Sequence, residues 1–171
     1  MRELILGGLV IPREAGLRLT QEYDTEDAVH EVRMNGGELR RQQTWGNKIR
    51  TTIRGSNGLI PVGLDGLDFT QPLLLSCIRV KAVTSPAFNI AITPNRRSDA
   101  GSTPLGFARI GRTWQRTDLS MNGDIAELAQ VPGASLYQVK YWPEFLCFAT
   151  RPRETGDVGL GFDWSFTARE I

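Results

Sequence analysis

The segment from residue 158 to residue 168 alternates apolar residues with glycine or polar residues without a break. The apolar positions are Val158, Leu160, Phe162, Trp164, Phe166 and Ala168. A strict period of two predicts a β-strand with one buried face, and this one would extend about 36 Å at roughly 3.3 Å per residue. Such a regular strand needs partners from earlier in the chain, so we interpret the rest of the sequence as the sheet that it closes.

Asn35-Gly36-Gly37 is the clearest turn signal in the chain. It separates alternating residues 29–34 from 38–45, and Asn-Gly accepts the positive φ that tight hairpin turns require. The acidic patch at 22–27 interrupts the earlier alternation and is expected to be a loop or a single helical turn. Further strands are expected at 3–11, 49–54, 73–83, 88–92, 107–110, 114–121, 136–142 and 145–150.

One run, at 124–131, fits both a strand and a helical face, and we favour the strand. With turn signals about every eight to twelve residues, the sequence predicts an all-β fold, either a β-sandwich or a partly open barrel. Antiparallel hairpins would build it, and the C-terminal strand would close it.

The length of 171 residues suits a single domain spanning 1–171, and residues 86–150 could form an inserted β-subdomain. Periodicity stops at 55–72, a long loop rich in glycine and proline that is nevertheless apolar. A loop of this kind has to pack on something.

Composition narrows the classes of partner. The formal net charge is +1, so a general nucleic-acid-binding surface is not expected. The sequence shows neither a signal peptide nor a run long enough to span a membrane, which predicts assembly in a cytosol. Cys77 and Cys147 lie in apolar runs, and a disulfide between them is disfavoured in a reducing compartment.

The residues that carry chemistry are sparse. The only histidine, His30, shares a strand face with Val32 and is expected to be partly buried. Carboxylates occur in pairs at Asp65 and Asp68 and within 24–27, which leaves a hydrolase as a minor alternative. Neither a metal site nor a cofactor is indicated, and we expect no catalytic residues.

The arginine and tryptophan residues suggest two kinds of binding surface. The alternation at 49–54 places Arg50 and Arg54 on one side of a strand, as a basic stripe facing solvent or a partner. Phosphate contacts by Arg50, Arg54, Arg153 and other arginines are the less favoured use, because acidic residues nearly balance the basic ones. A stand-alone sandwich that binds a carbohydrate or a surface receptor is the main alternative function, and it would use Trp114, Trp142 and the loop at 94–105.

Several of these segments resemble small tail-tip and baseplate proteins of long-tailed bacteriophages of the Mu-like or lambda-like kind, including distal tail proteins. The resemblance lies in Gln43-Thr44-Trp45 followed by 51–69 (TTIRGSNGLIPVGLDGLDF), the hairpin before them, Tyr137–Pro143, and the ending Trp164–Ile171. The closing strand is similar to the final strand of distal tail proteins, whose ring module is a β-sandwich.

The resemblance implies a structural, non-enzymatic protein located in the virion tail and assembled in the host cytoplasm. Copies would form a ring, as a hexamer or a trimer, that joins the tail tube protein to hub or fibre proteins. We expect the interface to use the apolar loop and the basic stripe, unless the protein's own sheet buries the loop. The interface candidates are Leu59, Ile60, Leu64, Leu67, Phe69, Arg50 and Arg54.

Overall fold

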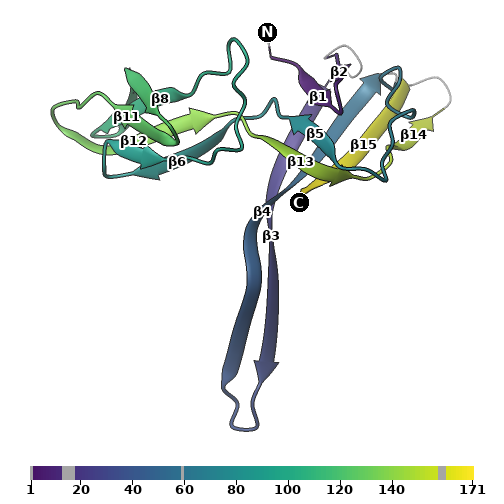
Figure 1. The fold of residues 1–171 in the computed structure, drawn as a ribbon, viewed down its shortest axis with the longest axis horizontal. Coiled ribbons are helices and arrows are strands. Elements are labelled where there is room, and N and C mark those ends of the chain that lie inside the picture. Colours follow the sequence, from purple (N-terminus) through teal and green to yellow (C-terminus); the bar gives the residue numbers. More distant parts are fainter. Residues whose placement is uncertain (1, 13–17, 59, 158–160) are drawn as a thin grey trace. The chain divides into compact units, whose positions relative to one another are not determined.

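The computed structural model describes residues 2–12, 18–58, 60–157 and 161–171. Its elements are β1 (Leu4–Leu6), β2 (Leu9–Ile11), β3 (Arg18–Arg33), β4 (Leu39–Gly58), β5 (Leu73–Ser76), β6 (Lys81–Ser85), β7 (Asn89–Ala91), β8 (Leu105–Ile110), β9 (Thr113–Thr117), β10 (Leu119–Asn122), β11 (Ile125–Leu128), β12 (Ala134–Tyr141), β13 (Glu144–Ala149), β14 (Arg153–Asp157) and β15 (Gly161–Glu170). Helices are absent from these ranges, so the predicted all-β class is confirmed (Figure 1). No helix in the described part of the chain is long and apolar enough to cross a bilayer.

The chain divides into two compact units. One consists of Met1–Ile5 with Ser76–Phe145, and the other of Leu6–Leu75 with Leu146–Ile171. The inserted subdomain considered at 86–150 overlaps most of the longer segment of the first unit. We call the first the inserted unit and the second the arm-bearing unit.

The arm-bearing unit contains most of an eight-stranded sheet with the order β2-β1-β5-β13-β15-β4-β3, in which β14 also pairs with β15. The closing strand β15 lies between β13 and β4, and its pairing with β4 is antiparallel. Trp164, Phe166 and Ala168 are buried on one face, but the prediction fails for Phe162, which lies beyond a register shift in the pairing with β4 and is 46% exposed. Residues 158–160, which include the predicted apolar positions Val158 and Leu160, lie outside the described residues.

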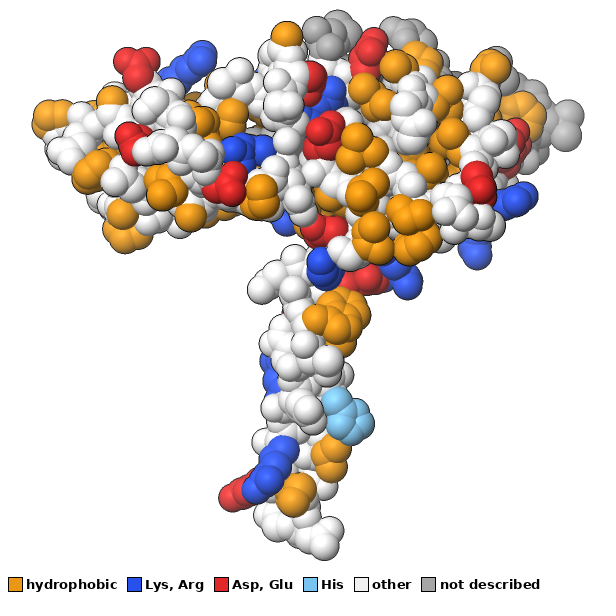
Figure 2. Space-filling view, in the orientation of Figure 1, with side chains coloured by type: hydrophobic (Ala, Val, Ile, Leu, Met, Phe, Trp, Pro, Cys, Tyr) orange, Lys and Arg blue, Asp and Glu red, His pale blue; other side chains and the backbone are white. Residues whose placement is uncertain are grey.

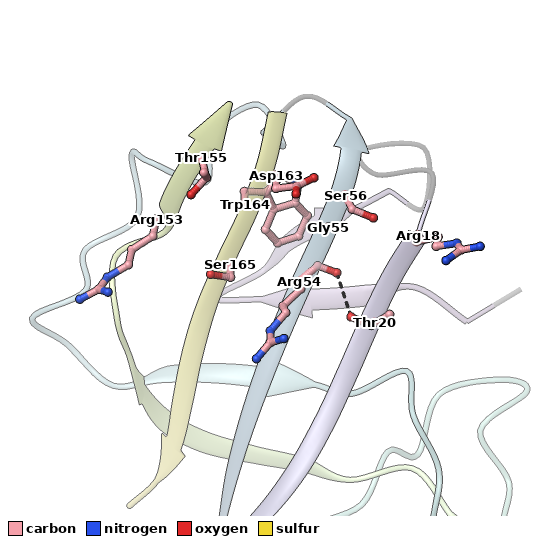
Figure 3. Close-up of a pocket in the computed structure, with 10 residues that line it drawn as sticks. All are labelled: Arg18, Thr20, Arg54, Gly55, Ser56, Arg153, Thr155, Asp163, Trp164 and Ser165. Carbon is pink, nitrogen blue, oxygen red and sulfur yellow. Dashed lines mark hydrogen bonds between the residues drawn. The ribbon is translucent and has the colours of Figure 1, made fainter. Parts of the chain in front are cut away.

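Close packing between β15 and β4 depends on a glycine. Trp164 pairs with Gly55, and a Cβ added at Gly55 would lie 2.4 Å from the indole ring. Any larger residue at this position would displace a side chain that is 1% exposed. Figure 3 shows the indole lying between the two strands.

The inserted unit has a core of its own between two small sheets, with the orders β6-β12-β8-β9 and β10-β11-β7. Apolar residues alternate inward from both sheets, as in a sandwich. The buried members of this core are Ile90, Ile92, Ala108, Ala126, Leu128, Tyr137, Val139 and Tyr141. Residues 125–128 form a strand, which confirms the choice of strand over helix for this run.

Several local predictions are wrong, because sheet pairing overrides local sequence. The acidic patch at 22–27 lies within β3, since carboxylates on an exposed strand face carry no burial cost. The runs at 73–83 and 114–121 are each divided between two strands of different sheets, β5 and β6 in the first case and β9 and β10 in the second. The first residues of the predicted loop at 55–72 continue β4 as far as Gly58. Residues 151–157, whose polar composition predicts a turn, contain β14, an added strand along β15.

Candidate functional site

The hairpin of β3 and β4 continues past the sheet that supports it. Strand β15 pairs with β4 from Arg50 to Gly58. Residues 39–45 of β4 pair with β3 alone among the described residues. The result is a two-stranded ribbon beyond the end of β15 (Figure 1). We call residues 28–45 of this ribbon, including its turn, the arm; each strand of it is about 20 Å long at 3.3 Å per residue.

Side chains of the arm are exposed on both faces. Every residue from 30 to 45 is exposed, so the prediction that His30 is partly buried is wrong. Hydrophobic side chains occur among the charged ones along this segment (Figure 2). Those with large exposed surface are Val32, Met34, Leu39 and Trp45, at 44%, 44%, 54% and 48%.

A β-bulge marks the base of the arm. The register between β3 and β4 shifts between Glu26 and Ala28. On the β4 side, Asn47 has a φ of 62°, and its N–H donates to Asp27 Oδ1 at 2.7 Å. Because a bulge bends a strand and increases its twist, this carboxylate fixes the direction in which the arm leaves the sheet.

The C-terminal end of β15 also contacts the base of the arm. The Ile49 N–H donates to Glu170 Oε2 at 2.8 Å, which adds one more hydrogen bond where β15 stops. Lys48 Nζ donates to the Ile171 carbonyl oxygen at 2.7 Å. Arg169 Nε lies 3.3 Å from Glu26 Oε1. These contacts fix the base of the arm and leave its distal part uncovered.

The two predicted arginines lie on β4, on the supported side of the bulge. Arg50 Nη1 is 3.8 Å from Glu26 Oε1, and Arg54 Nη2 is 3.9 Å from Glu22 Oε2. Their positions on β4 are two pleats apart on one face, as the alternation predicted. At distances of 3.8 Å or more, and with side chains 25–61% exposed, the ion pairs contribute little stability.

The apolar segment after β4 packs mainly on its own unit. Leu64 is completely buried, which is the second of the two alternatives for that residue, while Ile60, Leu67 and Phe69 are partly buried. Leu59 lies outside the described residues. The role of these residues and of the two arginines at an interface stays a prediction.

Asp68 closes a turn rather than facing a cleft. Its Oδ1 accepts from the Thr70 hydroxyl at 2.5 Å and from the Thr70 N–H at 3.0 Å. These hydrogen bonds lower the pKa of Asp68 below its ordinary value of 3.8. A carboxyl group held in its ionised form is unsuited to general acid work. Within the described ranges, no three His, Cys, Asp or Glu side chains are grouped as a metal site requires.

The features considered for carbohydrate binding differ in accessibility. Trp114 is 39% exposed, but Trp142 is 6% exposed and has the guanidinium carbon of Arg2 3.4 Å from its ring centroid. Trp142 is therefore not available for stacking on a sugar.

The loop at 94–105 is fixed by Arg97. This side chain is bidentate to Asp99 at 2.7 and 3.0 Å and donates to the Glu3 carbonyl at 2.6 Å.

Sequence reasoning missed two features. The full length of the arm was hidden because the acidic patch suggested a loop, although the Asn-Gly turn located its tip correctly. The second is Val62, which is 95% exposed between Pro61 and Gly63. An apolar residue between two turn formers carries no periodicity from which its exposure could be predicted.

Both Cys77 and Cys147 are buried thiols.

In comparisons with known proteins, no protein-family model, no curated protein and no solved structure matches the chain.

Proposed function

We propose that this protein is a structural, non-enzymatic subunit of an oligomeric assembly, and that its arm binds a neighbouring subunit. The observation that carries the proposal is the exposure of the arm on both faces. An isolated two-stranded hairpin is only marginally stable in water, and unpaired strand edges readily accept another strand. Exposed apolar side chains along the arm supply contact area for such a neighbour.

The finer proposal is that the assembly is a ring in the tail tip or baseplate of a long-tailed bacteriophage, joining the tail tube to hub or fibre proteins. Its support is the resemblance of the hairpin, the 51–69 segment and the closing strand to proteins of that group. An arm with a fixed base suits a heterologous ring contact, because one surface of each subunit then binds a different surface of the next.

The proposal is tested by shortening the arm. Because His30 and Gln42 face each other across the ribbon, residues 31–41 can be replaced by Asn-Gly, which forms a two-residue turn. Light scattering after size-exclusion chromatography should show an oligomer for the full chain and a folded monomer for the shortened chain. Electron microscopy of the full chain should show closed rings.

Two exposed tryptophans supply a matched pair of substitutions. Trp45→Ala on the arm should weaken assembly by about 10-fold or more, since buried aromatic residues often dominate interface energies. Trp114→Ala, in the inserted unit, should leave assembly unchanged. A full chain that stays monomeric at every concentration, or a shortened chain that assembles normally, would contradict the proposal.

The alternative function is recognition of a carbohydrate or a surface receptor by a stand-alone sandwich. The exposed ring of Trp114 supports it, but the burial of Trp142 removes one of its two aromatic contacts. A monomer that binds glycans and loses binding on Trp114→Ala would favour this function over assembly.

A further inference from the structure

We propose that the outer face of β14, β15 and β4 binds an oxyanion of the phosphate or sulfate type. This site lies entirely within the arm-bearing unit. It requires no second copy, so it does not depend on the proposed assembly.

Strand register places the arginines of this face in a row. Arg153 pairs with Ser165, and Ser165 pairs with Arg54 on its other side. Residues directly opposite one another in a sheet have side chains on the same face, so Ser165 lies between two arginines. Figure 3 shows Arg54 and Arg153 on either side of Ser165.

The next positions on the same face are hydroxyl-bearing. Thr167 pairs with Thr52, and their hydroxyl oxygens are 3.4 Å apart. One further pleat along, Arg169 pairs with Arg50. The face thus alternates rows of guanidinium groups with a row of hydroxyl groups, and both kinds of group donate hydrogen bonds to anionic oxygens.

A shallow hollow of about 380 Å³ lies over this pattern. Its walls contain three arginines and four hydroxyl side chains, and no carboxylate. The lining residues are Arg50, Thr52, Arg54, Thr150, Arg153, Ser165, Phe166 and Thr167. A neighbouring hollow of about 220 Å³ shares Arg54, Arg153 and Ser165 but also contains Asp163. The first hollow is therefore the better match for an anion.

The intramolecular partners of these arginines compete weakly. Arg54 and Glu22 are 3.9 Å apart, with side chains 60% and 61% exposed. Arg50 and Glu26 are 3.8 Å apart, with side chains 40% and 25% exposed, and Glu26 also lies 3.3 Å from Arg169. No ion pair of Arg153 is present among the described residues. Surface ion pairs contribute little, whereas a guanidinium forms stronger, bidentate hydrogen bonds to a phosphate.

The chemistry favours a small, multiply charged anion. Three guanidinium groups carry enough positive charge to neutralise a dianion, and the hydroxyl groups can donate hydrogen bonds to its remaining oxygens. The formal net charge of +1 makes a long polyanion a poor match for the protein as a whole. We expect a dissociation constant on the order of 1 mM, because an open site must compete with water and is screened by salt.

The test is a titration of the full chain followed by amide NMR shifts. The probes are inorganic phosphate, sulfate and sn-glycerol 3-phosphate, each compared with chloride at equal ionic strength. The expected result is saturable shifts centred on Thr52, Ser165 and Thr167 with phosphate and absent with chloride. Tighter binding of glycerol phosphate would indicate a phosphate carried on an organic molecule, and equal binding would indicate the free ion.

Charge-matched variants separate the site from general electrostatics. R54Q and R153Q should each weaken phosphate binding at least about 5-fold, while R116Q, which removes an exposed arginine of the inserted unit, should not. Glu22→Gln removes the carboxylate that competes for Arg54 and should tighten binding about 2-fold. Equal effects of R54Q and R116Q, or no saturable shifts with any of the three anions, would overturn the proposal.

Discussion

The two parts of the long hairpin share the same pair of strands but differ in what surrounds them. From residue 50 onward, β4 lies between β3 and β15, and Thr51 and Ile53 are completely buried. In the arm, β4 has β3 as its one neighbour within the described chain, and its side chains are exposed. Both parts consist of the same two strands, but their stability comes from different sources.

This contrast shows that hydrogen bonding between two strands does not by itself make a stable element. The supported part gains hydrophobic burial on one face, which is the main favourable term in folding. The arm has turn chemistry and backbone pairing but little burial, and in the proposed assembly a neighbouring subunit would supply the burial that it lacks. The contrast can be tested by making the same change in each part.

The largest expected effect comes from matched glycine substitutions. Gly55→Ala places a methyl group 2.4 Å from the Trp164 ring, so the free energy of unfolding should fall by about 3 kcal/mol or more. Gly36→Ala in the arm meets no atom within 4 Å and should change it by less than about 0.5 kcal/mol. Urea unfolding followed by tryptophan fluorescence measures both. Similar losses would show that the arm is as tightly packed as the sheet.

Truncation of an aliphatic side chain tests burial directly. Ile53→Ala in the supported part removes a side chain that is 0% exposed and should cost about 3 kcal/mol. Val32→Ala in the arm removes one that is 44% exposed and should cost less than about 0.5 kcal/mol in the monomer. The comparison requires a monomeric sample, since a partner that covers the arm would raise the second value.

Hydrogen exchange sharpens the comparison without any substitution. Amides of the arm should exchange about 100-fold faster or more than those of residues 51–53, because opening the ribbon exposes almost no apolar surface. In an assembled sample the arm amides should become protected. Fast exchange of the arm in both samples would indicate that the partner binds elsewhere.

The smallest expected effect concerns pH and lies outside the arm. The Thr70 hydrogen bonds lower the pKa of Asp68 below 3.8 in the folded chain. This contribution to stability is therefore fully present above the unfolded value and is lost as the pH falls through the folded value. An NMR titration should show the lowered pKa, and Asp68→Asn should reduce the loss of stability below pH 3.8. A pKa at or above 3.8 would contradict this account.

Local patterns predicted the fold class and several of the elements. The alternation of Trp164, Phe166 and Ala168 predicted a half-buried closing strand, and Asn35-Gly36 located the hairpin turn. Alternation also placed Arg50 and Arg54 on one face. These predictions succeed because strand pleating and turn geometry depend on residues close in sequence.

Other features required the tertiary structure. No sequence pattern indicated that β14 pairs with β15, and that pairing brings Arg153 beside Ser165. Alternation did not tell where β4 loses its second neighbour, although residues 40–44 of the arm are all polar whereas Ile49 and Ile53 alternate with polar residues in the supported part.

Backbone preference and side-chain alternation are local properties, so the sequence alone indicates that this chain forms β-strands joined by glycine turns. The folded chain was needed to show where the sheet ends and the arm begins, and which arginines of different strands share a face. Those outcomes depend on pairing between strands distant in the chain, and that pairing is set by the burial of whole faces rather than by any single segment.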